Sequence, residues 1–159
     1  MKLNKLILIL FITLTLTACT KENEEENIKN EYIALKSTLI SNEEYTEKDE
    51  LPCDITISVD RVEEDRIKYK VIMNNPKENM HNIKALAIHN YFTEEIFPSI
   101  GLFDSKKELL INEDNTEKIE LVGFIDSEKS IDNLNLKIKL WIEYTDDFDE
   151  TKDIYYKTT

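Results

Sequence analysis

The sequence predicts an all-β protein, built as an antiparallel sandwich that follows an N-terminal leader and a tether. Two observations predict this fold. Apolar and polar residues alternate over most of the chain beyond residue 51, which is the period of a half-buried strand. Clusters rich in Asn, Asp, Glu and Pro interrupt the alternating segments at short intervals, as expected where antiparallel strands reverse direction.

The alternating segments each have one apolar face. Their apolar residues stand at every second position: Ile55, Ile57 and Val59; Ile67, Tyr69, Val71 and Met73; Ile119, Leu121, Gly123 and Ile125; Leu134, Leu136, Ile138, Leu140, Ile142 and Tyr144. The last series is the cleanest, so we expect one long central strand over 134–144. A closing strand is expected at 154–156.

The run 83–92 is more uniformly apolar and fits either a helix or a strand, but its Tyr, Phe and Ile content favours a strand. Pro98 and Gly101 interrupt 96–103, which we expect to form short extended pieces around a bend, with another short piece at 109–111. About seven short strands in about 110 residues predict an immunoglobulin-like β-sandwich. The Cys, Trp, Cys arrangement of antibody domains is absent from the sequence.

The first residues have the three-part plan of a secretory signal. Lys2 and Lys5 supply positive charge, an apolar run extends over 6–16, and small residues and a cysteine follow. A membrane-spanning helix needs roughly 20 apolar residues, and this run ends sooner, before the acidic stretch 21–26. We therefore expect cleavage.

The end of this leader, Leu16-Thr17-Ala18-Cys19, resembles the lipobox of bacterial lipoproteins. That resemblance implies cleavage between Ala18 and Cys19 and acyl chains on Cys19. Only a thiolate is nucleophilic enough for the thioether, and two acyl chains give stable membrane attachment where one gives only marginal binding. An ordinary secretory leader with an accidental cysteine is the alternative.

Three regions are expected: a signal peptide at 1–18, a lipid-anchored tether at 19–50, and the sandwich at 51–159. The tether carries one stripe of a short amphipathic helix over roughly 28–41, formed by Ile28, Tyr32, Leu35 and Leu39. A helix of this length is marginal alone, so it must pack on the domain or fray.

The chain is strongly acidic, with 20 basic and 33 acidic residues and a net charge of -13. Loss of Lys2 and Lys5 with the leader would bring the charge to -15 (-13 minus 2). Such a surface repels phosphate backbones, so we expect no nucleic-acid partner. Once Cys19 is acylated, Cys53 has no disulfide partner, and we expect a small buried hydrophobe there rather than a reactive thiol.

The stretches 69–76, 82–86 and 96–101 resemble small lipoproteins of Gram-positive, Bacillota-type bacteria, a group of unknown function with an immunoglobulin-like sandwich. The resemblance covers roughly 51–159 and rests on strand and turn patterns. It implies a lipid-anchored protein on the extracytoplasmic face of the cell membrane, and it names no activity.

Few residues in the sequence are candidates for catalysis or metal binding. His81 is expected in a polar turn and His89 as a partly buried strand residue, neither at metal-ligand spacing with a cysteine. With two histidines and two glycines, the sequence has few residues that could form a nucleophilic triad or a glycine-rich phosphate-binding loop. We therefore expect no catalytic residue, no metal and no cofactor. Acidic turns at 113–115 and 146–150 leave calcium as an alternative to ordinary solvated turns.

Two apolar features invite a partner. By alternation Trp141 points away from the core, together with Lys137, Lys139 and Glu143. Either the 28–41 helix or a neighbouring side chain covers it, or it forms a binding site, because Trp is enriched at interaction hot spots. Phe97 and Ile100, in the bend, either present a patch to a partner or fill the core as a crossover between sheets.

These observations favour a non-enzymatic, membrane-anchored envelope accessory or binding module with an envelope protein as partner. A surface-anchored inhibitor or immunity-type protein acting on an exported enzyme is the alternative, and a hydrolase comes third.

Metabolic labelling tests the anchor. Palmitate should label the wild-type protein and leave Cys19→Ser unlabelled, because the thioether needs the cysteine sulfur. Labelling of the variant, or release of unlipidated wild-type protein, would contradict the lipobox interpretation.

Overall fold

The computed structural model describes residues 25–63, 65–91, 93, 96–112 and 117–158. The chain forms two compact units, Met1–Ala34 and Leu35–Thr159. A helix runs from residue 25 to residue 41, so its described beginning belongs to the first unit and its end to the second. No helix within the described ranges combines the length and apolar character needed to cross a bilayer.

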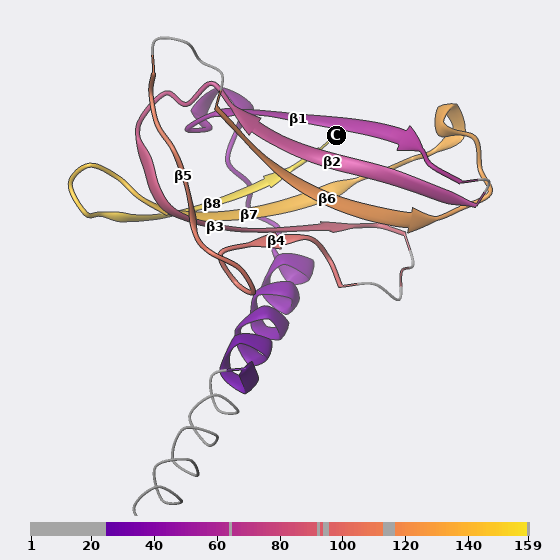
Figure 1. Cartoon of the computed structure of the whole chain (residues 1–159), viewed down its shortest axis with the longest axis horizontal. Helices are drawn as coiled ribbons and strands as arrows, with labels where there is room; N and C mark the ends of the chain where they lie inside the picture. Colours follow the sequence, from indigo (N-terminus) through magenta and orange to yellow (C-terminus); the bar gives the residue numbers. More distant parts are fainter. Residues whose placement is uncertain (1–24, 64, 92, 94–95, 113–116, 159) are drawn as a thin grey trace, which may run out of the picture. The chain divides into compact units, whose positions relative to one another are not determined.

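The described residues of the second unit form eight strands in two antiparallel sheets (Figure 1). The first sheet has three strands in the order β1–β2–β6, namely β1 (Asp54–Arg61), β2 (Arg66–Asn74) and β6 (Lys118–Asp126). The second has the order β4–β3–β7–β8, with β5 also paired to β3: β3 (Met80–His89), β4 (Ser99–Ile100), β5 (Lys107–Leu109), β7 (Ile138–Thr145) and β8 (Thr151–Lys157). Short 3-10 helices, η1 (Lys48–Glu50) and η2 (Ile131–Asn133), complete the unit.

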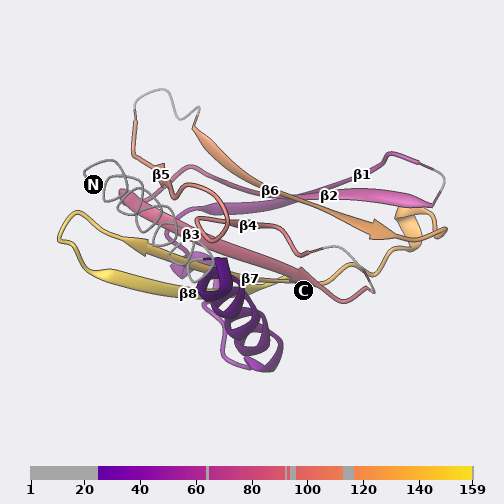
Figure 2. The same ribbon diagram turned by 60° about the horizontal axis from the view of Figure 1, so that its bottom comes forward.

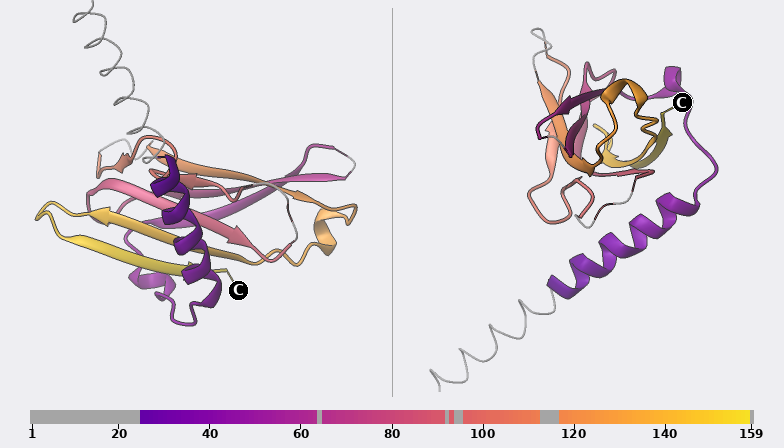
Figure 3. Two further views of the ribbon diagram at one scale, coloured as in Figure 1. Left: turned by 90° about the horizontal axis from the view of Figure 1, so that it is seen from below. Right: turned by 90° about the vertical axis from the view of Figure 1, so that its right-hand side faces the viewer.

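The two sheets form two layers around one core (Figures 2 and 3). In β2 and β6 every second residue is buried, as the alternation predicts. Both sheets contribute side chains to the same core cluster, among them Ile67, Tyr69, Val71, Leu121, Ile125, Ile83, Ala85, Leu140, Ile142 and Tyr144. The predicted antiparallel, mainly β architecture of two sheets is therefore confirmed.

One predicted strand is shorter than the pattern indicates. The expected strand over 134–144 begins only at Ile138. Before it, Asn135 N–H donates to the Tyr91 hydroxyl (3.0 Å) and Lys137 N–H donates to Asn90 Oδ1 (2.8 Å). Side chains thus take the backbone bonds that a ladder would use, although Leu134 and Leu136 still pack against the core. The shortened strand, β7, does lie between β3 and β8.

The first sheet depends on a close approach between β2 and β6. Tyr69 is paired with Gly123, and a Cβ built on Gly123 would overlap the Tyr69 ring. Tyr69 is fully buried. Gly123 therefore provides the space that the largest side chain of β2 occupies, which explains a glycine inside an otherwise apolar strand face.

Gly123→Ala should lower the free energy of unfolding by about 1–3 kcal/mol, the scale of overpacking in a filled core. Val122→Ala is the matched control, because Val122 is the neighbouring residue and is half exposed. Urea denaturation measures both, and the control should stay within about 0.5 kcal/mol of wild type. Equal stability of Gly123→Ala and wild type would show that Tyr69 moves aside without loss.

Candidate functional site

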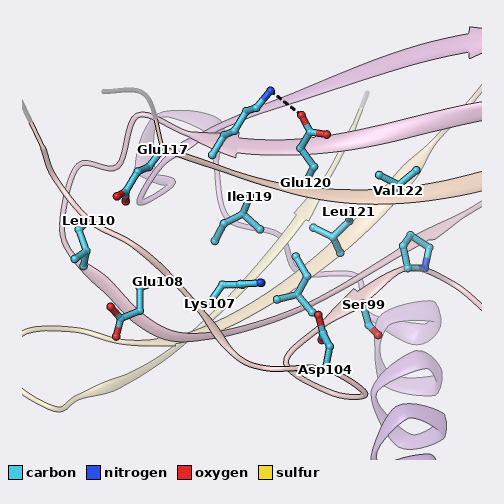
Figure 4. A pocket seen from close by; sticks show the side chains of 13 residues that line it. Ser99, Asp104, Lys107, Glu108, Leu110, Glu117, Ile119, Glu120, Leu121 and Val122 are labelled. Atoms are coloured by element: carbon cyan, nitrogen blue, oxygen red, sulfur yellow. Dashed lines mark ion pairs between the residues drawn. The ribbon is translucent and has the colours of Figure 1, made fainter. Parts of the chain in front are cut away.

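A concavity lies on one open side of the sandwich, between β6 and the β4–β5 segment. β6 pairs with β2 on one side only, and β4 and β5 both pair with β3. A groove of about 600 Å³ lies between these edges. Its lining residues come from both sheets: Pro98, Ser99, Ile100, Asp104, Lys107, Glu108, Leu110, Glu117, Lys118, Ile119, Glu120, Leu121 and Val122 (Figure 4).

The groove combines an apolar base with charged walls. Ile100, Ile119 and Leu121 are core residues whose side chains also line it. Lys107 and Asp104 lie along the β4–β5 wall (Figure 4). Gly101, with φ +71, makes the bend that separates β4 from β5, and a Cβ there would come within 2.8 Å of the Ile83 carbonyl oxygen. The bend is closed by Gly101 N–H donating to Asp104 Oδ1 (2.7 Å).

Charged side chains line both ends of the groove. Glu120 lies between two lysines, at 2.9 Å from both Lys70 Nζ and Lys118 Nζ, and the bonds to Lys118 and then Lys70 lower its pKa to about 2. Glu108 and Glu117 lie on opposite walls of the groove at the Leu110 end (Figure 4). Glu108 Oε1 lies 3.6 Å from His81 Nδ1, and this imidazole is charged only when protonated. With Asp104, Glu108, Glu117 and Glu120 against Lys107 and Lys118, the groove lining as a whole is acidic.

Along β6, the backbone N–H and C=O groups of every second residue face the groove. Ser127 N–H, which continues the strand, donates to the Asp65 carbonyl in the β2 register. Because backbone groups alternate sides along an antiparallel strand, odd-numbered residues of β6 bond β2 and even-numbered residues point to the free edge. Lys118, Glu120 and Val122 are the even-numbered residues that line the groove.

His89 lies at the Phe124 end of the free edge of β6. Its Nδ1 accepts the Tyr91 N–H (3.2 Å), and the ring also hydrogen-bonds the backbone of Phe124. Since Nδ1 accepts, the other nitrogen must carry the hydrogen and donate to the Phe124 carbonyl. The ring also packs edge-on against Tyr69 (5.2 Å) and Phe97 (4.9 Å). Burial lowers the pKa of His89, so the ring is neutral.

The residues that the sequence predicted for a partner surface lie at different places. Ile100 is buried in the core and pairs with Ala85, which favours the core-filling crossover, although it also lines the groove. Phe97 is half buried between His89 and Lys36, whose Nζ lies 5.0 Å from the ring centroid. Ala18 and Cys19 lie outside the described residues, so lipidation stays a prediction.

Trp141 is only 3% exposed. It stands outside the core cluster, as expected for the opposite face of β7, and its indole N–H donates to Asp153 (2.9 Å). On the same face, Lys139 Nζ donates to the carbonyls of Leu39 (3.2 Å) and Ile40 (2.6 Å) at the end of the helix, and Leu39 is fully buried. The end of the helix therefore lies on this face, which favours the covered alternative for Trp141.

The remaining polar clusters have structural roles. His81 lies in β3 rather than in a turn, and its Nε2 is 3.0 Å from Asp147 Oδ1. In the acidic turn, Asp146 accepts the N–H groups of Phe148 and Glu150 and pairs with Lys152 (3.1 Å). No group of three or more His, Cys, Asp or Glu side chains in the described part of the chain is arranged to hold a metal ion.

Cys53 is buried, as the sequence predicted, and burial raises the pKa of its thiol to about 12. Sequence reasoning missed the groove itself. The only available signal was the broken pattern around Gly101, which leaves β4 and β5 too short to cover an edge.

The two histidines should give opposite pH dependences between pH 7.5 and 5.5. Burial lowers the pKa of His89, so its contribution to stability is present above about 6.5 and is lost as the pH falls. The bond to Asp147 raises the pKa of His81, so its contribution is present below about 6.5 and is lost as the pH rises. In His81→Asn the free energy of unfolding should therefore fall on acidification, and in His89→Gln it should rise.

Urea denaturation at both pH values measures these slopes independently of the absolute stability of each variant. An unchanged or increased stability of His81→Asn at pH 5.5 would show that His89 is not held neutral by burial.

No protein-family model, no curated protein and no solved structure matches this chain.

Proposed function

We propose that this chain is a lipid-anchored, extracytoplasmic binding module without catalytic activity, and that the groove between β6 and the β4–β5 segment is its binding site. The leader and the lipobox-like residues 16–19 support anchoring through Cys19 at the membrane. The acidic tether that follows supports a domain held away from an anionic surface. The proposal includes membership of the small Gram-positive lipoproteins that the sequence resembles.

The strand order supports an immunoglobulin-like assignment for the sandwich. In the constant-type fold, strands A, B and E are neighbours in one sheet and C, F and G in the other. The orders β1–β2–β6 and β3–β7–β8 correspond to these two series. The constant-type sheet has a fourth strand, D, beside E. In this chain the corresponding segment instead pairs with β3, as β4 and β5.

The groove is the observation that carries the binding role. Its volume, about 600 Å³, is within the usual range of ligand sites, roughly 300–1,000 Å³, and it combines an apolar base with a few polar groups. Its lining contains neither histidine nor cysteine, so Ser99 has no imidazole base within the groove. This composition favours recognition of a partner over nucleophilic chemistry.

Site-specific photo-crosslinking in the cells that make the protein tests this proposal. A benzophenone amino acid at position 122 should give a covalent adduct with another protein, because Val122 lines the groove and is 41% exposed. The matched control is position 62, since Val62 is 44% exposed and lies on the turn between β1 and β2.

Adducts at position 122 and not at 62 would support the groove as the binding site. Equal adducts at both positions, or none at 122, would contradict it. The identity of the adduct also separates the two functional classes: an exported enzyme whose activity falls on binding would indicate the inhibitor or immunity-type alternative.

A further inference from the structure

We propose that the groove binds an extended segment of a partner protein, which joins the first sheet as a fourth strand along residues 118–122 of β6. This inference rests on the proposed function and names the mode of binding and the chemistry of the partner.

The first step concerns the backbone of β6. Lys118, Glu120 and Val122 direct their N–H and C=O groups away from β2, and no backbone hydrogen bond joins these groups to another described residue across the groove. Such groups form a template for a further strand, and strand addition to a sheet edge is a recurring mode of peptide recognition. The groove beside them provides the room.

The second step compares the sheet edges. The 3-10 helix η2 lies against β1 at the other edge of the first sheet. In the second sheet, Thr46 N–H donates to the Tyr155 carbonyl of β8 (2.7 Å), so the segment after the helix meets that edge at Tyr155. The free edge of β6 is also the place where strand D pairs in the constant-type immunoglobulin fold. A bound segment would restore the four-stranded sheet.

The third step sets the length of the segment. His89 already bonds the Phe124 carbonyl, so pairing cannot continue beyond Val122 without displacing a buried ring. Residues 118–122 span about 13 Å at roughly 3.3 Å per residue. The bound segment is therefore short, about five residues, with side chains that alternate between the groove and the outer face.

The fourth step concerns the partner's chemistry. Side chains that enter the groove meet Ile119, Leu121 and Ile100, so alternate residues of the segment are apolar. The end of the segment beside Glu108 and Glu117 carries a lysine or arginine, which the two carboxylates favour.

A second copy of this chain is a poor occupant. It carries the same net charge of -13. Antiparallel pairing of residues 118–122 with themselves would also place Glu120 opposite Glu120 of the other copy, and like charges directly opposite are destabilising. A different, cationic protein segment fits better.

Peptides selected from a random library of about twelve residues against the mature chain provide the probe. Enriched peptides should combine alternating apolar residues with a basic residue. In one such peptide, N-methylation of every second residue in one register should weaken binding at least tenfold, because those N–H groups face β6, and methylation in the other register should have little effect. Equal effects in both registers would overturn strand addition, as would a library without enriched peptides.

Variants of the chain provide the second measurement. Val122→Pro removes one edge N–H without breaking a bond to β2, so it should weaken peptide binding at least tenfold relative to Val122→Ala, with thermal unfolding checking that both fold. Unweakened binding to a folded Val122→Pro would overturn the inference. Glu108→Gln with Glu117→Gln should reduce affinity several-fold at low salt, and the exposed pair Glu43→Gln with Glu44→Gln should not.

The two proposals fail differently. Adducts at position 122 combined with N-methylation that shows no alternation would retain the groove as a binding site and reject strand addition. An absence of adducts would reject the binding site itself. Concentration-dependent dimers, blocked by Val122→Pro, would make a second copy the occupant and overturn the choice of partner.

Discussion

The neutral ring of His89 is the interaction on which the arrangement of the two sheets at the groove depends. It extends from β3 in one sheet to the backbone of β6 in the other, and it packs against Tyr69 of β2 and Phe97 of the bend. A protonated imidazole could no longer accept the Tyr91 N–H, and its charge would be buried. One buried hydrogen-bonded side chain therefore fixes the spacing of the sheets where β6 ends, and so sets one limit of the groove.

The other limit arises from chain connectivity. After β3, the chain returns along the outer edge of β3 in two short pieces separated by the bend at Gly101, rather than crossing to pair with β6. Two and three residues of strand are too few to close the side of the sandwich. The groove and the free edge of β6 thus have a single cause: β4 and β5 pair with β3 in the second sheet and not with β6. Lys118 and Glu120 place charge on this edge, as natural proteins do to limit uncontrolled pairing.

The strands could be predicted because their signal is local. The alternation in β2 and β6 specifies one buried face, and the structure has that face buried. The outward direction of Trp141 followed from the same period. The start of β7 could not be predicted, since it depends on hydrogen bonds that its preceding backbone donates to Asn90 and Tyr91, more than forty residues earlier. The groove could not be predicted either, because it depends on which strand β4 and β5 pair with, and periodicity contains no information about strand pairing.

The proposed anchor and the proposed strand addition fit together energetically. A segment of about five residues forms only a few backbone hydrogen bonds, each contributing roughly 1 kcal/mol net, and association must offset at least several kcal/mol of lost translational and rotational freedom. Alone, such a site would bind weakly. Acyl chains on Cys19 would confine the domain to the membrane surface, and a partner confined to the same surface would meet it at a high effective concentration, which raises occupancy without any new contact. A short, edge-limited site is therefore better suited to a tethered protein than to one free in solution.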